Sequence, residues 1–237
     1  MGHYQSDSVL LNKNQKYRLL IKTVEGKEYL SDYLPVKKTP AIDSVSWRNE
    51  SNGVNIYVNS HDQSENSRYY KWTYEETWEI RSRWPVMYGW VNGNVSATTL
   101  DEINKMYYCW HSQNSSAIHL GSTAQLTDNI ISMIPVVNIP PHGEQLDIRY
   151  SILVKQVAFD KPTYDFYQIM KKNTETTGSI FAPLPIDLST NIHCVSNTSE
   201  KVIGYMFVST EESQKNFYFK FRDSGMELSI RMCKYIS

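Results

Sequence analysis

The chain has 237 residues, of which 41% are hydrophobic, so it can bury a large core, and an intrinsically disordered protein is excluded. Its 24 basic and 25 acidic side chains nearly cancel, and no basic block is longer than the pair Lys37-Lys38, so nucleic acid is not expected as a partner. Seventeen Tyr and six Trp favour strands over helices. The expected class is therefore mainly β.

Several other classes of protein lack their sequence signals in this chain. No apolar run approaches the ~18–20 residues that a transmembrane helix needs, and the N-terminus has no signal-peptide pattern. Cys109, Cys194 and Cys233 show no zinc-ligand spacing, and no phosphate loop, nucleophile elbow or metalloprotease motif is present. We therefore expect no metal and no cofactor, while the odd number of cysteines leaves a disulfide open.

The first predicted element is a β-hairpin. Residues 17–23 and 28–34 are separated by a turn signal at Gly26, and the first of these segments alternates apolar and polar side chains. A lone hairpin is only marginally stable in water, and few residues precede it. The hairpin is therefore expected to be the last strands of a domain whose earlier strands are missing.

An extended connector is predicted at residues 35–40, because Pro35 and Pro40 each disfavour helix in the residue before them. We therefore expect the first unit to occupy residues 1–40 and a main domain to occupy residues 41–237. The main domain begins with a second hairpin, whose two alternating segments flank the turn signal Asn52-Gly53.

Residues 69–80 predict a long strand with one buried face, because aromatic and β-branched types recur with period two. Glu76 is the exception on that face, where burial costs several kcal/mol unless the carboxylate is hydrogen-bonded or paired. We expect Glu76 to be a buried structural acid. The alternative is the acid of a glycoside hydrolase, which needs a second positioned carboxylate, but the nearest acids, Glu75 and Glu79, lie on the opposite face.

Residues 81–147 show little periodicity and are expected to form an insertion, in which the apolar spacing at 122–134 predicts a short helix. A clearer helix is predicted at about 160–173, with Asp160 as its N-cap and Pro162 in its first turn. Short strands with one or two helices between them favour an immunoglobulin-like or fibronectin-like β-sandwich with a helical insertion.

Surplus aromatic residues are concentrated in the first half of the predicted insertion. Two uses are open for them, namely anchors in a protein interface or a stacking platform for sugar rings in a carbohydrate-binding module. The interface is the favoured interpretation, because Trp and Tyr are the usual anchor residues. The candidate residues are Trp84, Tyr88, Trp90, Tyr107 and Trp110.

Five segments together resemble one bacterial lipoprotein family, known as domain of unknown function 4249. They are TPAIDSVSW at 39–47, YYKWTYEETWEI at 69–80, YCW at 108–110, IRYSILVKQVAFDKPTYDFYQIMKKNTETTGSIF at 148–181 and NIHCVSNTSEKVIGYMFVS at 191–209. Five blocks in order are far more specific than any one of them, and they span most of the chain.

The resemblance implies an exported lipoprotein of the Gram-negative outer membrane, commonly encoded beside a TonB-dependent receptor, with an immunoglobulin-like domain before the main one. The hairpin at 17–34 would then be the end of that domain. No lipobox cysteine is found in this sequence, so we expect attachment to the membrane only through a lipid anchor that lies outside it. The family has no known catalytic residues. An exported setting permits oxidation, so Cys109 and Cys194, which lie beside apparent strand ends, are a candidate disulfide.

We therefore expect a non-catalytic accessory of an outer-membrane nutrient-uptake system, located in the cell envelope, with a TonB-dependent receptor as its partner and a glycan or other nutrient as a further ligand. A carbohydrate-binding module is the first alternative, and a glycoside hydrolase using Glu76 is the second.

Overall fold

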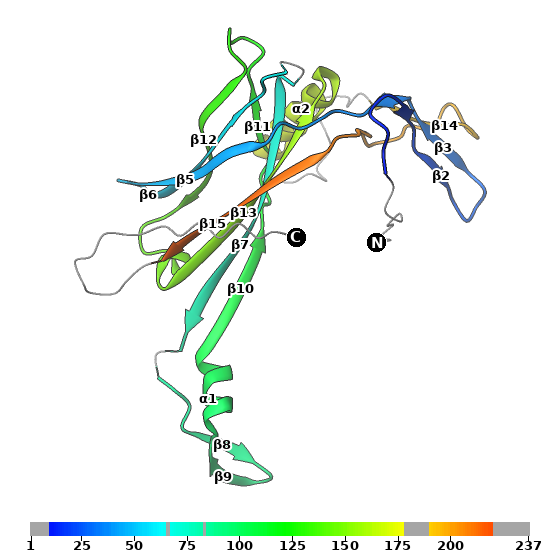
Figure 1. Ribbon diagram of the computed structural model, residues 1–237. Coiled ribbons are helices and arrows are strands. Elements are labelled where there is room, and N and C mark those ends of the chain that lie inside the picture. Colours follow the sequence, from blue (N-terminus) through cyan, green and yellow to red (C-terminus); the bar gives the residue numbers. More distant parts are fainter. Residues whose placement is uncertain (1–9, 65–66, 83, 178–189, 220–237) are drawn as a thin grey trace.

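The computed structural model describes residues 10–64, 67–82, 84–177 and 190–219. Over these residues the protein is mainly β. Figure 1 shows two sheets of a sandwich, a smaller group of strands that includes the first strands of the chain, and an arm that projects from one end of the sandwich.

The larger sheet of the sandwich is five-stranded and antiparallel. Its strands are β7 (Tyr69–Arg81), β10 (Tyr108–Asn114), β11 (His119–Ser122), β13 (Arg149–Phe159) and β15 (Glu211–Phe219). β7 lies at the centre, pairing with β13 along one side and with β10 and β11 along the other, and β15 pairs with β13. β7 is the long strand that the alternation at residues 69–80 predicts.

The smaller sheet of the sandwich has three strands, which are β5 (Ile42–Glu50), β6 (Gly53–His61) and β12 (Ile130–Ile139). β5 and β6 form the hairpin predicted from its turn signal. Gly53 in that turn has a φ of 121°, and a Cβ there would lie 2.0 Å from the carbonyl oxygen of Ile139. Only glycine therefore fits this position.

The helix predicted over residues 122–134 is wrong, because Ile130 already begins strand β12. Ile130 is exposed whereas Ile131 is buried, as expected when side chains alternate along a strand. A small set of apolar residues like this one is compatible with a helical period and with a strand period. The pairing of residues 130–139 with β6 makes this segment a strand. Pro135 is tolerated because β12 lies at the edge of its sheet.

The hydrophobic core lies between the two sheets, and Trp72 and Trp78 are its largest side chains, with 0% and 1% of their surface exposed. Gln156 of β13 is buried beside them. Its Oε1 accepts a hydrogen bond from the Trp72 indole at 2.8 Å, and its Nε2 donates to the Pro40 carbonyl at 2.9 Å and to Ser60 Oγ at 3.0 Å. One polar side chain thus links both sheets and the connector before β5.

Helix α2 (Lys161–Thr177) covers the outer face of the larger sheet, at the position where the sequence predicts a helix. Asp160 caps it, since its carboxylate accepts a hydrogen bond from the Thr163 amide at 3.0 Å. Tyr167 stacks on Phe159 with ring centroids 5.1 Å apart, and the Lys71 ammonium lies 4.3 Å from the centre of the Tyr167 ring. Both partners lie on the face of their strand that points away from the core.

The first strands of the chain form small sheets beside the sandwich. They are β1 (Lys16–Tyr17), β2 (Leu20–Lys22), β3 (Glu28–Ser31) and β4 (Leu34–Pro35), and β14 (Ile192–Cys194) joins them from much later in the chain. β2 and β3 form the predicted hairpin, β14 pairs with the other side of β3, and β1 pairs with β4. Glu200 adds hydrogen bonds to Lys27 at 2.8 Å and Tyr29 at 2.6 Å. Residues 190–200 therefore pack with the first strands.

Only part of the region expected to be an insertion, 81–147, is separate from the sandwich, because this region also supplies β10, β11 and β12. The part that projects is residues 84–107, which we call the arm (Figure 1). It contains β8 (Tyr88–Val91), β9 (Asn94–Ala97) and α1 (Leu100–Tyr107). A 3-10 helix, η1 (Glu144–Leu146), follows β12. In the described residues, neither α1 nor α2 has the length and hydropathy that a membrane crossing requires.

The burial of Trp72 gives the first prediction. Trp72→Ala would leave a cavity between the sheets and would remove the N–H group that donates a hydrogen bond to Gln156. It should therefore lower the free energy of unfolding by about 3–5 kcal/mol. Urea unfolding followed by far-ultraviolet circular dichroism measures this loss. Substitution of the exposed Trp84 by Ala is the control and should change stability by less than about 1 kcal/mol. Equal stability of Trp72→Ala and the parent would contradict the burial of Trp72.

Candidate functional site

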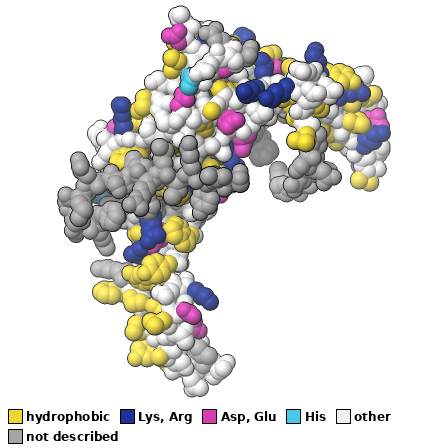
Figure 2. All heavy atoms as spheres, in the orientation of Figure 1, with side chains coloured by type: hydrophobic (Ala, Val, Ile, Leu, Met, Phe, Trp, Pro, Cys, Tyr) yellow, Lys and Arg dark blue, Asp and Glu magenta, His cyan; other side chains and the backbone are white. Residues whose placement is uncertain are grey.

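The arm exposes most of its large apolar side chains. Trp84, Tyr88 and Trp90 are 72%, 68% and 75% exposed. We call them, together with the other exposed apolar side chains of the arm, the arm patch; the others are Val86, Met87, Val95 and Leu100. Figure 2 shows hydrophobic side chains gathered over this projection. Single exposed apolar residues are ordinary on a protein, but a cluster of large ones marks an interaction surface.

Local interactions give the arm its shape. β8 and β9 form a hairpin through Asn92 and Gly93, whose φ angles of 50° and 81° suit the tight turn that matches the twist of its strands. Thr99 and Glu102 then form a capping box at the start of α1. The arm is thus a folded projection, and its apolar side chains point into solvent.

The base of the arm is held to the larger sheet by aromatic contacts. The Arg81 guanidinium lies 5.0 Å from the centre of the Tyr108 ring, and Tyr107 packs edge-on against Tyr108 at 4.9 Å. Trp110, on β10, is 58% exposed. The structure thus divides the candidate aromatics into two groups, with Trp84, Tyr88 and Trp90 on the arm and Tyr107 and Trp110 at its base.

Glu79 lies beside the base of the arm. The period-two pattern of β7 predicts that this side chain is exposed, and this prediction is wrong. Glu79 is only 1% exposed. Its carboxylate forms a hydrogen-bonded ion pair with Arg81 at 2.6 Å and approaches the Arg149 Nε at 3.0 Å without the angle of a hydrogen bond. A paired cation is what makes a buried carboxylate tolerable. Arg81 lies two residues away on the same face of β7, whereas Arg149 comes from β13, and no local pattern could reveal that second partner.

Glu76 lies on the core side of β7 and is 6% exposed. Its Oε1 accepts a hydrogen bond of 2.6 Å from the hydroxyl of Tyr150 on the neighbouring strand β13. Burial raises the pKa of Glu76 above its ordinary value, and the Tyr150 hydrogen bond partly offsets this effect. The pKa of Tyr150 is also raised, first by burial and then by the Glu76 charge. The two groups form a buried polar pair that only the β7–β13 register brings together.

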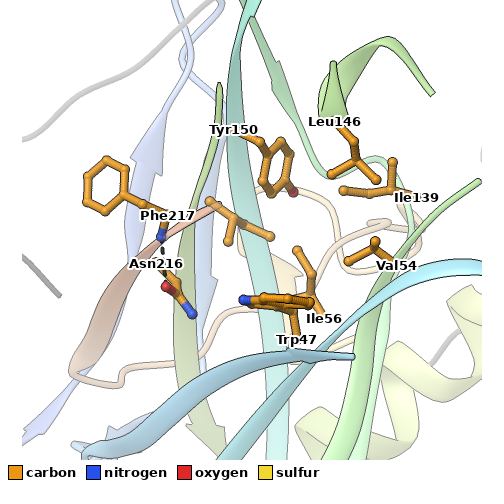
Figure 3. A pocket seen from close by; sticks show the side chains of 9 residues that line it. Trp47, Val54, Ile56, Ile139, Leu146, Tyr150, Asn216 and Phe217 are labelled. Atoms are coloured by element: carbon orange, nitrogen blue, oxygen red, sulfur yellow. Dashed lines mark hydrogen bonds between the residues drawn. The ribbon is translucent and has the colours of Figure 1, made fainter. Parts of the chain in front are cut away.

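A small pocket opens between the sheets next to this pair, and Figure 3 shows its lining. Trp47 from β5, Leu146 from η1 and Tyr150 from β13 converge on it. The free space within it is about 10 Å³, which is room for about one water molecule. This pocket cannot hold a sugar ring as it stands, so the exposed arm, rather than this cavity, is the candidate site.

The candidate disulfide between Cys109 and Cys194 is not formed. Cys109 is exposed on β10 of the larger sheet, whereas Cys194 is buried on β14 among the first strands. Their places near strand ends in the sequence do not make them neighbours, because β10 and β14 belong to different sheets. Among the residues that the structure describes, no group of three or more His, Cys, Asp or Glu side chains is placed to hold a metal ion.

Glu76 gives a prediction about pH. Because its pKa is raised in the folded protein, the unfolded chain ionises first as the pH rises, so the stability contributed at this position is full below the unfolded pKa and declines above it. Glu76→Gln keeps an acceptor for Tyr150 and cannot ionise. The stability of the parent relative to Glu76→Gln should therefore fall as the pH rises above about 4, the ordinary pKa of a glutamate, as measured by urea unfolding over a series of pH values.

Tyr150→Phe is the matched control for this measurement. It removes the hydrogen bond that favours the charged form of Glu76, so it should cost about 1–3 kcal/mol at neutral pH and make the loss of stability with pH steeper. A parent and a Glu76→Gln variant whose stability difference is constant with pH would contradict the raised pKa.

Comparison with known proteins places the chain in a family. The family described as domain of unknown function, DUF4249, matches residues 1–215. No curated protein and no solved structure matched the chain. The five segments quoted from the sequence all lie within the matched residues, and the match covers most of the chain. The protein therefore belongs to the DUF4249 family.

Proposed function

We propose that this protein is a non-catalytic accessory that binds a protein partner through the arm patch, and that the partner is a TonB-dependent receptor of a nutrient-uptake system in the outer membrane. The observation that carries the proposal is the exposure of Trp84, Tyr88 and Trp90 on one folded projection. Trp and Tyr bury large areas with few rotatable bonds, and for this reason they dominate the energetics of protein interfaces.

The geometry of the arm supports this role. Its patch stands away from the sandwich, so a partner can reach it from more than one side without contacting the sheets (Figures 1 and 2). The base is fixed to the sheet through the contact of Arg81 with Tyr108 and the buried ion pair of Arg81 with Glu79. A pre-positioned patch loses less entropy when it binds than a mobile loop would.

The receptor and the outer-membrane location rest on the resemblance to envelope lipoproteins. A glycan or another nutrient would then be a secondary ligand.

Carbohydrate binding is the alternative that one observation favours. The exposed indoles of Trp84 and Trp90 offer flat apolar faces, which suit the apolar faces of pyranose rings. A glycoside hydrolase has less support, because the Glu76 carboxylate is buried and bound to Tyr150. The nearest acids along β7, Glu75 and Glu79, belong to the other face of this strand.

Co-purification tests the proposal. A full-length parent protein carrying an affinity tag would be isolated from detergent-solubilised outer membranes, and the TonB-dependent receptor encoded beside it would be quantified by mass spectrometry. The triple variant Trp84→Ser, Tyr88→Ser, Trp90→Ser should lose at least tenfold of the recovered receptor, because three anchors of the interface are removed. Its melting temperature should stay within a few degrees of the parent, because these side chains are exposed.

The matched control replaces three exposed hydrophobic residues far from the arm, Val24, Tyr33 and Ile203, by Ser. This variant should recover the receptor as the parent does. Two results would contradict binding through the arm patch. In one, the control variant also fails to recover the receptor; in the other, the arm variant recovers as much receptor as the parent does. Specific binding to a glycan array that the arm variant abolishes, without any recovered receptor, would establish the carbohydrate alternative instead.

A further inference from the structure

β10 has an unprotected outer edge. It pairs with β7 through an uninterrupted register of seven residue pairs, and no strand in the described parts of the chain pairs with its other side. All seven of its side chains are exposed. Its sequence, Tyr108 to Asn114, contains no Asp, Glu, Lys, Arg or Pro. Edge strands of soluble proteins usually carry such residues or a bulge, since an open edge attracts another strand.

The other edges of the sandwich are protected in different ways, and β11, which follows β10 along the same side of β7, is only four residues long. β12 and β5, the edges of the smaller sheet, contain register shifts. β15, the opposite edge of the larger sheet, carries charged side chains. The safeguarding residues are Pro135 in β12, Asp43, Arg48 and Glu50 in β5, and Glu211, Glu212 and Lys215 in β15. Among the described strands of the sandwich, β10 is therefore the long edge strand that carries neither a charged side chain, a proline nor a register shift.

The register shows which backbone groups of β10 point outward. The Ser82 amide donates to the Tyr107 carbonyl, and the Ser115 amide donates to the Tyr74 carbonyl at 2.8 Å. Hydrogen-bonded pairs alternate along an antiparallel ladder, so residues 109, 111 and 113 also bond to β7. Residues 110, 112 and 114 therefore turn their N–H and C=O groups away from β7. Tyr108 also points outward, but its amide is already bonded to the Asn104 carbonyl of α1.

We propose that β10 pairs with β10 of a second copy of this chain, antiparallel and about a two-fold axis at Ser112. In this register Ser112 faces Ser112 of the second copy, Trp110 faces its Asn114, and Asn114 faces its Trp110. Each of these three pairs exchanges two backbone bonds, about six in all. The larger sheets of the two copies then form one continuous sheet.

The outward backbone groups of β10 are complementary to those of a second β10 strand, and for this reason we infer a second copy of the chain as the partner of this edge. The three residues with both backbone groups outward, Trp110, Ser112 and Asn114, are evenly spaced around Ser112, so a two-fold axis there matches every donor with an acceptor. Because β10 carries no Asp, Glu, Lys or Arg, pairing two copies of it places no two carboxylates and no two Lys or Arg side chains opposite each other. A two-fold contact of this kind closes on itself and gives a dimer rather than a fibre.

Sedimentation equilibrium of the full chain over a concentration series tests the pairing. The parent should sediment at twice the monomer mass at high concentration. Ser112→Pro removes an outward N–H and places its ring where the second strand would lie, so it should weaken dimerisation at least tenfold, while the β7 ladder keeps its bonds. Ser112→Ala is the control. It removes only the hydroxyl that contacts Thr77, and it should dimerise as the parent does.

Cysteine crosslinking keeps the proposal testable if Ser112→Pro fails to fold. In a Cys109→Ser background, Ser112→Cys should form an intermolecular disulfide under mild oxidation, because the two-fold axis puts the two residues opposite each other. Asn114→Cys is the control, because residue 114 is also exposed but faces residue 110 of the second copy and lies far from residue 114 of that copy. It should therefore crosslink much less.

A parent that remains monomeric, unchanged dimerisation of a folded Ser112→Pro variant, or equal crosslinking at residues 112 and 114 would each overturn the pairing. These outcomes are independent of receptor binding, because the arm variant with Ser at residues 84, 88 and 90 should dimerise normally.

Discussion

The hydrogen bonds of Gln156 are the interaction on which the arrangement of the sandwich depends. Its amide is fully buried and joins the Trp72 indole, Ser60 and the Pro40 carbonyl. Dispersion and the hydrophobic effect alone would let two apolar sheet faces slide over each other, whereas a buried amide tolerates only the position in which its partners are in reach. The network therefore fixes how the smaller sheet lies on β7 and β13, and it fixes where the connector enters.

A second group of hydrogen bonds holds the connector, at Lys37 and Thr39. The Thr39 amide donates to Thr210 Oγ1 at 2.9 Å, and its hydroxyl accepts a hydrogen bond from the Ala158 amide at 3.0 Å. Lys37 bonds through its backbone to the Val208 carbonyl and the Thr210 amide. Within the described residues, two segments run between the first strands and the sandwich, the connector and the segment just before β15, and these two segments are bonded to each other. The first strands are consequently held by two segments rather than by one linker.

With the core fixed in this way, the two outward features of the larger sheet have different physical bases. The arm patch presents apolar area, whose burial against a partner is non-directional and tolerant of shape. The edge of β10 presents backbone donors and acceptors, which accept only an extended strand in one of a few registers. Both features meet at Tyr108 and Trp110, where the arm joins the sheet, so a partner on the arm and a second copy on the edge would occupy adjacent surfaces.

The sequence alone determined the elements whose signals are local. Period two at residues 69–80, the Asn52-Gly53 turn and the Asp160 cap each depend on side chains within one element, so the long strand, the hairpin and the helix were predictable, and with them the mainly β class. The arm residues Trp84, Tyr88 and Trp90 were singled out by type.

Tertiary structure decided everything that depends on partners distant along the chain. Pairing with β6 made β12 a strand, pairing with β3 brought residues 192–194 back to the first strands, and Arg149 helped to make a buried site for Glu79 on the face that alternation leaves exposed. The same is true of Cys109 and Cys194, which lie in different sheets. A local pattern reports which side chains prefer burial, but the burial of a charge or the choice of a strand partner depends on what another part of the chain supplies.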